Sequence, residues 1–249
     1  MMKISQMSSQ MPETPKFFGR RQGRTIHKTK TYLLQNFLSK IEISAQTDFS
    51  SGTLFSTNVQ KISLEIGFGD GAHLAGMALK EPQTGFIGIE VFKNGIAHLL
   101  TLLTGVKEGA DIVPDVSLLP QRTDNVRIFA DDARLLFPRL PDSFVDTVYL
   151  LFPDPWPKKR HAERRFINPQ NLNEIARILK KDGTFLVATD HKVYKSWVLR
   201  QMHNRKDFVW TAKSSADWRN PPADWVETKY QQKALREGRR PVFFEYRRP

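Results

Sequence analysis

The sequence predicts an α/β domain with a mostly parallel, doubly wound sheet. Short apolar runs typical of strands alternate with helical patterns, which is the arrangement of a parallel sheet covered on both faces. The length of 249 residues suits one such domain with extensions, and the hydrophobic fraction of 40% is enough for a sizeable core. We assign residues 51–249 to this domain and residues 1–50 to a basic, partly disordered N-terminal arm with a short helix.

Seven strands and several helices can be placed in order along the chain. Runs of aliphatic and aromatic residues predict strands at 62–66, 86–90, 126–130, 145–152, 184–188, 208–210 and 242–246. Helical patterns cover 32–43, 72–80 and 96–103. Asn168 and Pro169 open a further helix, which we expect to run to Gly183. The stretch 105–124 has no clear periodicity and is interpreted as a loop insertion.

The composition excludes several classes of protein. The chain has no cysteine, so it holds neither disulfides nor thiolate metal sites, and we expect no metal. The first 16 residues are polar, unlike a signal peptide, and no run approaches the roughly 20 apolar residues that a membrane span needs. We therefore expect a cytoplasmic protein with no membrane partner. The sequence does not fix the oligomeric state, and we favour a monomer.

The net charge of +12 is concentrated in three segments. Residues 1–30 hold seven lysines and arginines against one acidic residue, residues 158–165 hold five against one, and residues 229–249 hold seven against two. The rest of the chain is close to neutral. Basic segments on a near-neutral body are typical of a polyanionic partner such as RNA, although basic tails and a solvated helix face explain the charge equally well.

A glycine-rich loop follows the first predicted strand and leads into a helix. Gly67 and Gly69 let the backbone turn sharply and approach a ligand, and Glu90 ends the second strand, where it can accept both hydroxyls of a ribose. Glu65 and Asp70 place carboxylates beside this loop, where they oppose the pyrophosphate of a dinucleotide. The pattern favours S-adenosyl-L-methionine, which carries no phosphate, and leaves a dinucleotide or a plain strand–helix connection as alternatives.

Asp132 follows the third predicted strand. Its carboxylate can accept a hydrogen bond from the amino group of an adenine, or it can cap the helix that begins at Ala133. The two interpretations suit this residue equally well.

The segment after the fourth predicted strand combines an acid and an aromatic ring with three prolines. The prolines between Pro153 and Pro157 make a rigid loop, because they can neither continue a strand nor open a regular helix. Ligands of doubly wound sheets bind beyond the strand ends, where the strand order reverses, so Asp154 and Trp156 should face the glycine loop and suit a planar base. The alternative is a tight turn with a core tryptophan.

A basic run continues from this loop through residues 158–165. Phosphate contacts position a nucleic acid while a pocket reads the base. We assign phosphate contacts to Lys158, Arg160, Arg164 and Arg165, and to the arginines at 20–24. A solvated basic face is the alternative.

These pieces together resemble the bacterial tRNA (guanine-N7-)-methyltransferase family. The matching motifs occur in family order over about residues 20–247: RRQGR at 20–24, LEIGFGDG at 64–71, GIE at 88–90, DA at 132–133, FPDPWPKKRH at 152–161, ATD at 188–190 and TKY at 228–230. The proline-rich motif with its basic continuation is highly specific, whereas the glycine loop alone is not.

The resemblance implies a Rossmann-like class I methyltransferase fold of seven strands, the last one antiparallel. It also implies methyl transfer from S-adenosyl-L-methionine to N7 of a guanosine in the tRNA variable loop. By motif, the cofactor residues are Glu65, Gly67, Gly69, Glu90 and Asp132, with the active-site aspartate Asp154 close to the cofactor, and the substrate residues are Lys158, Asp190, Thr228 and Gln231. Where the family usually has Thr-x-x-Glu, this chain has the neutral Gln231, which presents only one oxygen.

The chemistry that the resemblance implies is simple. N7 of neutral guanine has a lone pair and no proton, so it can attack the methyl group directly. We expect Asp154 to hold the base and stabilise the positive charge that passes to the purine, and not to act as a general base. Two other functions stay open: methylation of an exocyclic amine in DNA or RNA, and RNA binding without catalysis. A dinucleotide oxidoreductase is disfavoured by Asp70 and the basic loop.

Overall fold

The computed structural model describes residues 15–49, 52, 54–106 and 124–249. The start of the arm and most of the stretch interpreted as an insertion lie outside the described residues. In the part of the arm that is described, two helices, α1 (Lys28–Asn36) and α2 (Leu38–Ile41), occupy the region where the sequence predicted one. Leu33, Phe37 and Ile41 are buried in an apolar cluster with residues of the main domain.

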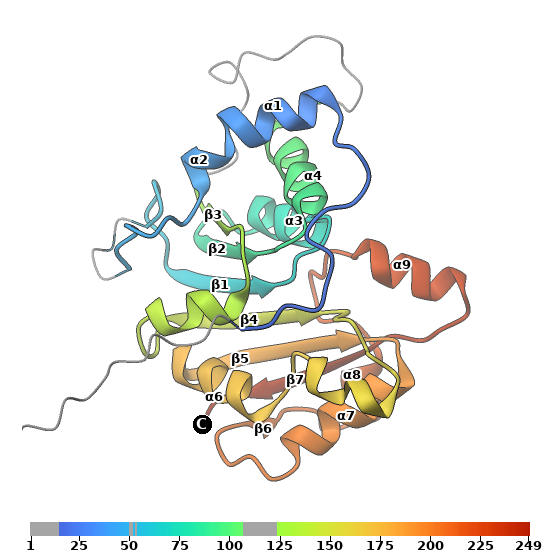
Figure 1. Cartoon of the computed structure of the whole chain (residues 1–249). Helices are drawn as coiled ribbons and strands as arrows, with labels where there is room; N and C mark the ends of the chain where they lie inside the picture. Colours follow the sequence, from blue (N-terminus) through green and yellow to red (C-terminus); the bar gives the residue numbers. More distant parts are fainter. Residues whose placement is uncertain (1–14, 50–51, 53, 107–123) are drawn as a thin grey trace, which may run out of the picture.

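Seven strands form one sheet in the order β3-β2-β1-β4-β5-β7-β6 (Figure 1). Their bounds are β1 (Lys61–Ile66), β2 (Thr84–Ile89), β3 (Val126–Phe129), β4 (Val145–Leu151), β5 (Leu179–Thr189), β6 (Val209–Trp210) and β7 (Val242–Arg247). Strands β1 to β5 pair in parallel, and β7 runs antiparallel to both of its neighbours, β5 and β6. The predicted mostly parallel sheet with an antiparallel last strand is confirmed.

Helices cover both faces of the sheet (Figure 1). On one face, α3 (Ala72–Lys80) and α4 (Lys93–Thr104) share an apolar cluster with α1 and α2, and on the other α5 (Ala133–Leu136), α6 (Pro169–Ile178) and α7 (Lys192–Met202) share a second one. Neighbours on a strand point to opposite faces, so Phe86 belongs to the first cluster and Ile87 to the second. The remaining helices are α8 (Ser215–Arg219), α9 (Lys229–Arg236) and the 3₁₀ helices η1 (Phe137–Arg139) and η2 (Lys159–Arg164).

The helix that begins at Pro169 ends earlier than the sequence predicted. Asn168 caps it as expected, since its side chain accepts a hydrogen bond from the N–H of Asn171. However, α6 stops at Ile178, and Leu179 is a buried residue of β5 that pairs with Val145. The apolar spacing could not reveal this boundary, because Leu179 is buried in the core whether it ends a helix or begins a strand.

The fold brings the predicted site segments to one edge of the sheet. Strand β1 lies between β2 and β4, so the strand order reverses there, and the three strands end together because Ile66 pairs with both Ile89 and Leu150. The glycine loop, the end of β2 and the proline-rich loop therefore leave the sheet side by side.

The described ranges contain no helix that is long and apolar enough to cross a membrane. Among the same residues, no group of three or more acidic or histidine side chains is placed to hold a metal ion.

Candidate active site

A cavity of about 640 Å³ lies at the edge of the sheet where the strand order reverses. It is bounded by the glycine loop, the ends of β2, β3 and β4, the proline-rich loop, residues 163–171, Tyr230 and arm residues 17–20. Of the residues predicted from the sequence, the cavity brings together Gly67, Gly69, Glu90, Asp132, Asp154, Arg164 and Arg165. Lys158, Arg160, Asp190, Thr228, Gln231 and Glu65 do not line it.

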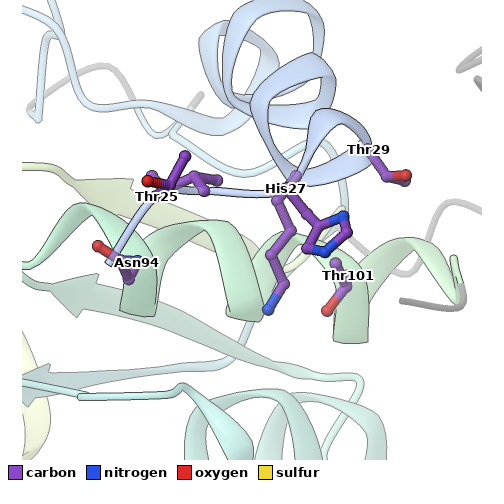
Figure 2. Close-up of a pocket in the computed structure, with 7 residues that line it drawn as sticks. Thr25, His27, Thr29, Asn94 and Thr101 are labelled. Atoms are coloured by element: carbon purple, nitrogen blue, oxygen red, sulfur yellow. The ribbon is translucent and has the colours of Figure 1, made fainter. Parts of the chain in front are cut away.

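A second pocket lies between the arm, α1 and α4, where His27, Thr29, Asn94 and Thr101 surround it (Figure 2). Its volume is about 120 Å³, well below the roughly 300–1,000 Å³ typical of small-molecule sites, and it holds none of the predicted residues. The larger cavity is therefore the candidate active site.

The glycine loop forms the floor of this cavity with backbone conformations that favour glycine. Gly67 and Gly69 have φ angles of 69° and 60°, in the left-handed region. A Cβ added to Gly67 would meet no atom within 4 Å, so the backbone there is open to a ligand. At Gly71 a Cβ would instead lie 2.7 Å from Leu99, because α3 begins here in close contact with α4.

Glu90 is held rigidly at the end of β2. Its Oε2 accepts from the N–H of Gly69 at 2.8 Å, and its Oε1 accepts from those of Val91 and Phe92 at 2.8 and 2.9 Å. Burial raises the pKa of Glu90 above its ordinary value, although the three N–H groups oppose that shift. The carboxylate is thus an oriented acceptor on the cavity wall.

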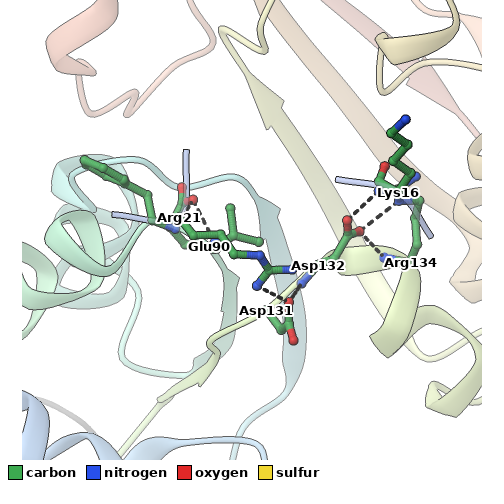
Figure 3. Close-up of polar contacts among 8 residues, drawn as sticks. Lys16, Arg21, Glu90, Asp131, Asp132 and Arg134 are labelled. Atoms are coloured by element: carbon green, nitrogen blue, oxygen red, sulfur yellow. Dashed lines mark hydrogen bonds and ion pairs between the residues drawn. The ribbon is translucent and has the colours of Figure 1, made fainter. Parts of the chain in front are cut away.

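Asp132 caps a helix, which is one of the two roles that the sequence left open. Its Oδ1 accepts from the backbone N–H of Arg134 at 2.9 Å, and its two oxygens also accept from the guanidinium of Arg134 at 2.9 and 2.6 Å (Figure 3). Both carboxylate oxygens are therefore engaged within the protein. Its neighbour Asp131 pairs with Arg21 of the arm at 2.8 Å.

Glu65 lies apart from the other predicted cofactor residues. Its side chain is 3% exposed, and its Oε2 lies 2.9 Å from Nδ1 of His73. The His73 ring in turn packs against Trp225 and Tyr149. Glu65 therefore pairs with a buried histidine and does not line the cavity.

The proline-rich loop is held in an uncommon backbone conformation by Arg165. Phe152 and Trp156 have φ angles of 50° and 40°, which non-glycine residues rarely adopt. Arg165 donates to the carbonyl oxygens of Pro155 at 3.1 Å and Trp156 at 2.9 Å, and its guanidinium lies 4.5 Å from the ring centre of Trp197. Arg165 is 5% exposed and supports the loop, and its predicted contact with a phosphate stays a prediction.

The loop presents Asp154 to the cavity, as the sequence predicted. Asp154 is exposed, and nothing in the described part of the chain pairs with it. Next to it, Trp156 forms an aromatic contact with Phe18 of the arm, and Arg164 lies over both rings at 5.0 and 4.7 Å. Arg164 therefore joins the arm to the loop, whereas Lys158 and Arg160 are exposed.

The arm contributes the cavity residues Phe17 and Phe18, which the sequence did not predict, besides Arg20, which was assigned to a phosphate contact. Residues 17–20 line the cavity, and the segment is fixed by hydrogen bonds from Lys93 N–H to the Arg21 carbonyl and from Gly23 N–H to the Asn94 side chain, at 3.0 and 2.8 Å. The adjacent pair Phe17 and Phe18 in an otherwise polar arm was the available signal, since exposed aromatic pairs in basic segments are unusual.

Comparison with known proteins identifies the family of the chain. Residues 59–243 match a family described as "Putative methyltransferase". The chain is 39% identical to the tRNA (guanine-N(7)-)-methyltransferase of Chelativorans sp., covering 96% of this chain and 99% of that protein. It is 41% identical to the enzyme of the same name from Paramagnetospirillum magneticum, covering 95% and 94%. The chain belongs to the tRNA (guanine-N7)-methyltransferase family.

Solved structures confirm the methyltransferase fold. The antibiotic-resistance methyltransferase Kmr aligns with a TM-score of 0.53 at 14% identity, covering 83% of this chain and 95% of that one. The 16S rRNA methyltransferase KamB aligns with a TM-score of 0.51 at 15% identity, covering 84% and 99%.

The residues that family motifs place at the substrate are mostly engaged within the protein. Asp190 forms an ion pair with Arg239, and Thr228 caps α9 by accepting from the N–H of Gln231 at 2.9 Å. Gln231 is 4% exposed. Tyr230, the last residue of the TKY motif, does line the cavity, and burial together with the negative charges of nearby carboxylates raises its pKa.

Proposed function

We propose that this protein transfers a methyl group from S-adenosyl-L-methionine to N7 of a guanosine in the variable loop of tRNA. The observation that carries the proposal is the placement of the glycine loop, Glu90 and Asp154 around one cavity, in a member of this family. Oriented acceptors on one side and a stiff acid-aromatic loop on the other suit a nucleoside cofactor facing a planar base.

The cavity fits the cofactor in size and in chemistry. Its volume of about 640 Å³ lies in the range of small-molecule sites, and Gly67 leaves the backbone open to a ligand. We assign contact with the cofactor ribose to Glu90, whose three backbone hydrogen bonds leave about one acceptor position, and contact with the adenine side to the Asp132 segment, because both line the cavity. S-adenosyl-L-methionine supplies an electrophilic methyl group bound to a positively charged sulfur.

The protein's part in the reaction is to orient the base and stabilise charge. Guanine N7 offers a lone pair without losing a proton, so no side chain has to act as a base. Asp154 provides a negative charge beside a purine ring that becomes positive. Well-aligned reactants gain roughly 7–11 kcal/mol from orientation, which we assign to Trp156 and the rigid loop that carries it.

The tRNA is held by the exposed part of the basic surface. The side chains of Lys158 and Arg160 are exposed near the cavity and have no partner in the described part of the protein, so they can contact phosphates. We further propose that residues 1–50 act as an arm to the catalytic domain, that the protein is a monomer, and that it works in the cytoplasm with tRNA.

Methyl transfer to unfractionated tRNA tests this function. The protein is incubated with methyl-labelled cofactor and tRNA, and the RNA is digested to nucleosides. We expect N7-methylguanosine, mapped to the variable loop by chemical cleavage at the modified base. A methylated exocyclic amine would contradict the assigned base, and tRNA binding without transfer would favour a non-catalytic RNA-binding protein.

A further inference from the structure

Tyr230 brings an aromatic ring to the cavity from α9. It lines the cavity, and its ring lies 3.1 Å from the place that a Cβ of Gly69 would take, so the ring packs directly on the glycine loop. Figure 1 shows α9 beside the ends of β1 and β4. Tyr230 is 54% exposed, which leaves much of its side chain open to a ligand.

The first turn of α9 is anchored on both sides of Tyr230. Thr228 caps the helix by accepting from the N–H of Gln231 at 2.9 Å. The Oε1 atom of Gln231 accepts from the indole N–H of Trp225 at 2.6 Å, and the Trp225 ring packs against His73 of α3 at 4.5 Å. The ring of Tyr230 is therefore positioned before a ligand arrives, which reduces the entropy that binding costs.

Negative charges lie near the hydroxyl of Tyr230. Burial and the charges of Glu90, Asp154 and Asp70 raise the pKa of Tyr230, so the hydroxyl keeps its proton at neutral pH. Asp70 belongs to the glycine loop, Glu90 follows β2, and Asp154 belongs to the proline-rich loop. This part of the cavity favours a positively charged ligand.

The methylated sulfur of the cofactor should lie between the ribose and the target base. In the proposed reaction the methyl group passes in line from this sulfur to guanine N7. We assigned Glu90 to the ribose and Asp154 to the base, and Tyr230 borders the same cavity near both of them. The ring of Tyr230 therefore faces the part of the cavity where we expect the positive charge of the sulfonium.

An aromatic ring is suited to such a charge. The face of a tyrosine ring is partly negative and attracts a cation that lies within about 6 Å of its centre. Proteins recognise quaternary ammonium ligands in this way. A sulfonium has the same charge on a similarly alkylated centre, and it has no proton to donate to a carboxylate.

We propose that the Tyr230 ring contacts the sulfonium of S-adenosyl-L-methionine and distinguishes this cofactor from its neutral product, S-adenosyl-L-homocysteine. Transfer of the methyl group to N7 returns an electron pair to the sulfur and removes its positive charge, so the attraction to the ring ends when the reaction is complete. The proposal rests on the function proposed above. It gives Tyr230 a part in binding the cofactor, whereas the motif around it was assigned to the substrate.

Ligand binding to the protein without tRNA tests the proposal. S-adenosyl-L-methionine is compared with S-adenosyl-L-homocysteine and with sinefungin, in which an amine-bearing carbon replaces the methylated sulfur and restores a positive charge. Calorimetry gives the three affinities for the wild type, Tyr230→Phe and Tyr230→Leu. Tyr230→Leu should reduce the preference for each cationic ligand over the neutral one by roughly three- to thirtyfold, and Tyr230→Phe, which keeps the ring, should retain the preference.

A control on the same helix separates the ring contact from a disturbance of α9. Leu235 is 51% exposed and does not line the cavity, so Leu235→Ala should keep the wild-type preference. An unchanged preference in Tyr230→Leu overturns this proposal alone, and an accompanying rise in the KM for tRNA would place the ring against the base instead. A preference lost in Tyr230→Phe overturns it too, because the hydroxyl would then carry the effect. A wild type that does not bind S-adenosyl-L-methionine overturns the proposed function itself.

Discussion

The basic run at 158–165 divides into two parts that the structure uses differently. Lys158 and Arg160 in the first part are exposed beside the cavity. Arg164 and Arg165 in the second part are engaged by the protein, one between two aromatic rings and the other against a tryptophan and two backbone carbonyls. One continuous pattern of charge thus contains a surface available to a polyanion and a support for the active-site loop.

The difference follows from the chemistry of the groups and their neighbours. A guanidinium is planar, stacks on aromatic faces and donates along several fixed directions, so it can be buried where an ammonium stays hydrated. Trp156, Trp197 and Phe18 provide such faces near the second part of the run. Counting charges does not reveal which arginines have aromatic neighbours in space.

The largest effect is expected at Asp154, the group that the second part of the run helps to position. Asp154→Asn removes the negative charge that we propose to lie beside the reacting purine, and losses of this kind cost roughly 10²–10³ in kcat. Because Asp154 is exposed, the free energy of unfolding should change little. Steady-state kinetics with tRNA measure kcat, and thermal denaturation measures the stability. Turnover within a few-fold of wild type in a folded variant would remove Asp154 from the mechanism.

Arg165→Ala should instead destabilise the protein. It leaves the carbonyls of Pro155 and Trp156 without their buried donor, at a cost of about 3 kcal/mol in the free energy of unfolding. Lys159→Ala, an exposed charge of the same run, is the matched control and should stay within about 0.5 kcal/mol of wild type. Denaturant titrations compare the two. If Arg165→Ala and Lys159→Ala were equally stable, Arg165 would contribute no more to the fold than an exposed surface charge.

Glu90 tests whether the cavity wall that we propose to bind the cofactor is independent of the basic run. Glu90→Gln should weaken binding of S-adenosyl-L-methionine by roughly tenfold, since hydrogen bonds to charged acceptors are lost, and leave tRNA binding unchanged. Burial raises the pKa of Glu90 above 4.5, so on acidification the carboxylate is protonated earlier than usual. As this carboxylate becomes protonated, the affinity for the cofactor should fall in the wild type but not in Glu90→Gln. Calorimetry at a series of pH values measures both affinities, and an equal dependence on pH in the two proteins would contradict the prediction.

The sequence predicted the sheet better than the details of the site. The apolar runs predicted where the strands lie, the alternation of strands and helices predicted a mostly parallel sheet, and the family resemblance implied the antiparallel last strand. The left-handed glycines of the loop follow from a backbone conformation that few other residues adopt. The end of α6 was missed because burial alone does not separate a helix end from a strand start at Leu179. The position of the arm was missed for a related reason, since Phe17 and Phe18 lie far in sequence from the cavity that they border.

Side-chain partners were the least predictable feature. The sequence assigned Glu65 to the cofactor by motif and Arg165 to a phosphate by charge, and it did not reveal that each also contacts a side chain from another segment, His73 for the first and Trp197 for the second. Such pairings depend on distances between elements, which the sequence does not contain. Asp132 is a milder case, because its capping role was one of two stated alternatives.

The smallest effect, and the most direct test of the divided run, is the salt dependence of tRNA binding. Affinity falls with salt, and each phosphate contact makes the slope of log affinity against log salt concentration steeper. The change is about 0.9 per contact on a duplex, taking the value for duplex DNA, and about 0.7 on single strands. Replacing Lys158 and Arg160 by glutamine should therefore flatten the slope by about 1.4–1.8 units. Arg164→Lys keeps the charge but weakens the stacking between Phe18 and Trp156, so it should leave the slope unchanged while perturbing the loop. Filter binding between low and moderate salt gives both slopes, and cofactor affinity provides the internal control. A slope unchanged in the double variant would mean that the exposed part is only a solvated face, and the distinction between the two parts would then rest on Arg165 alone.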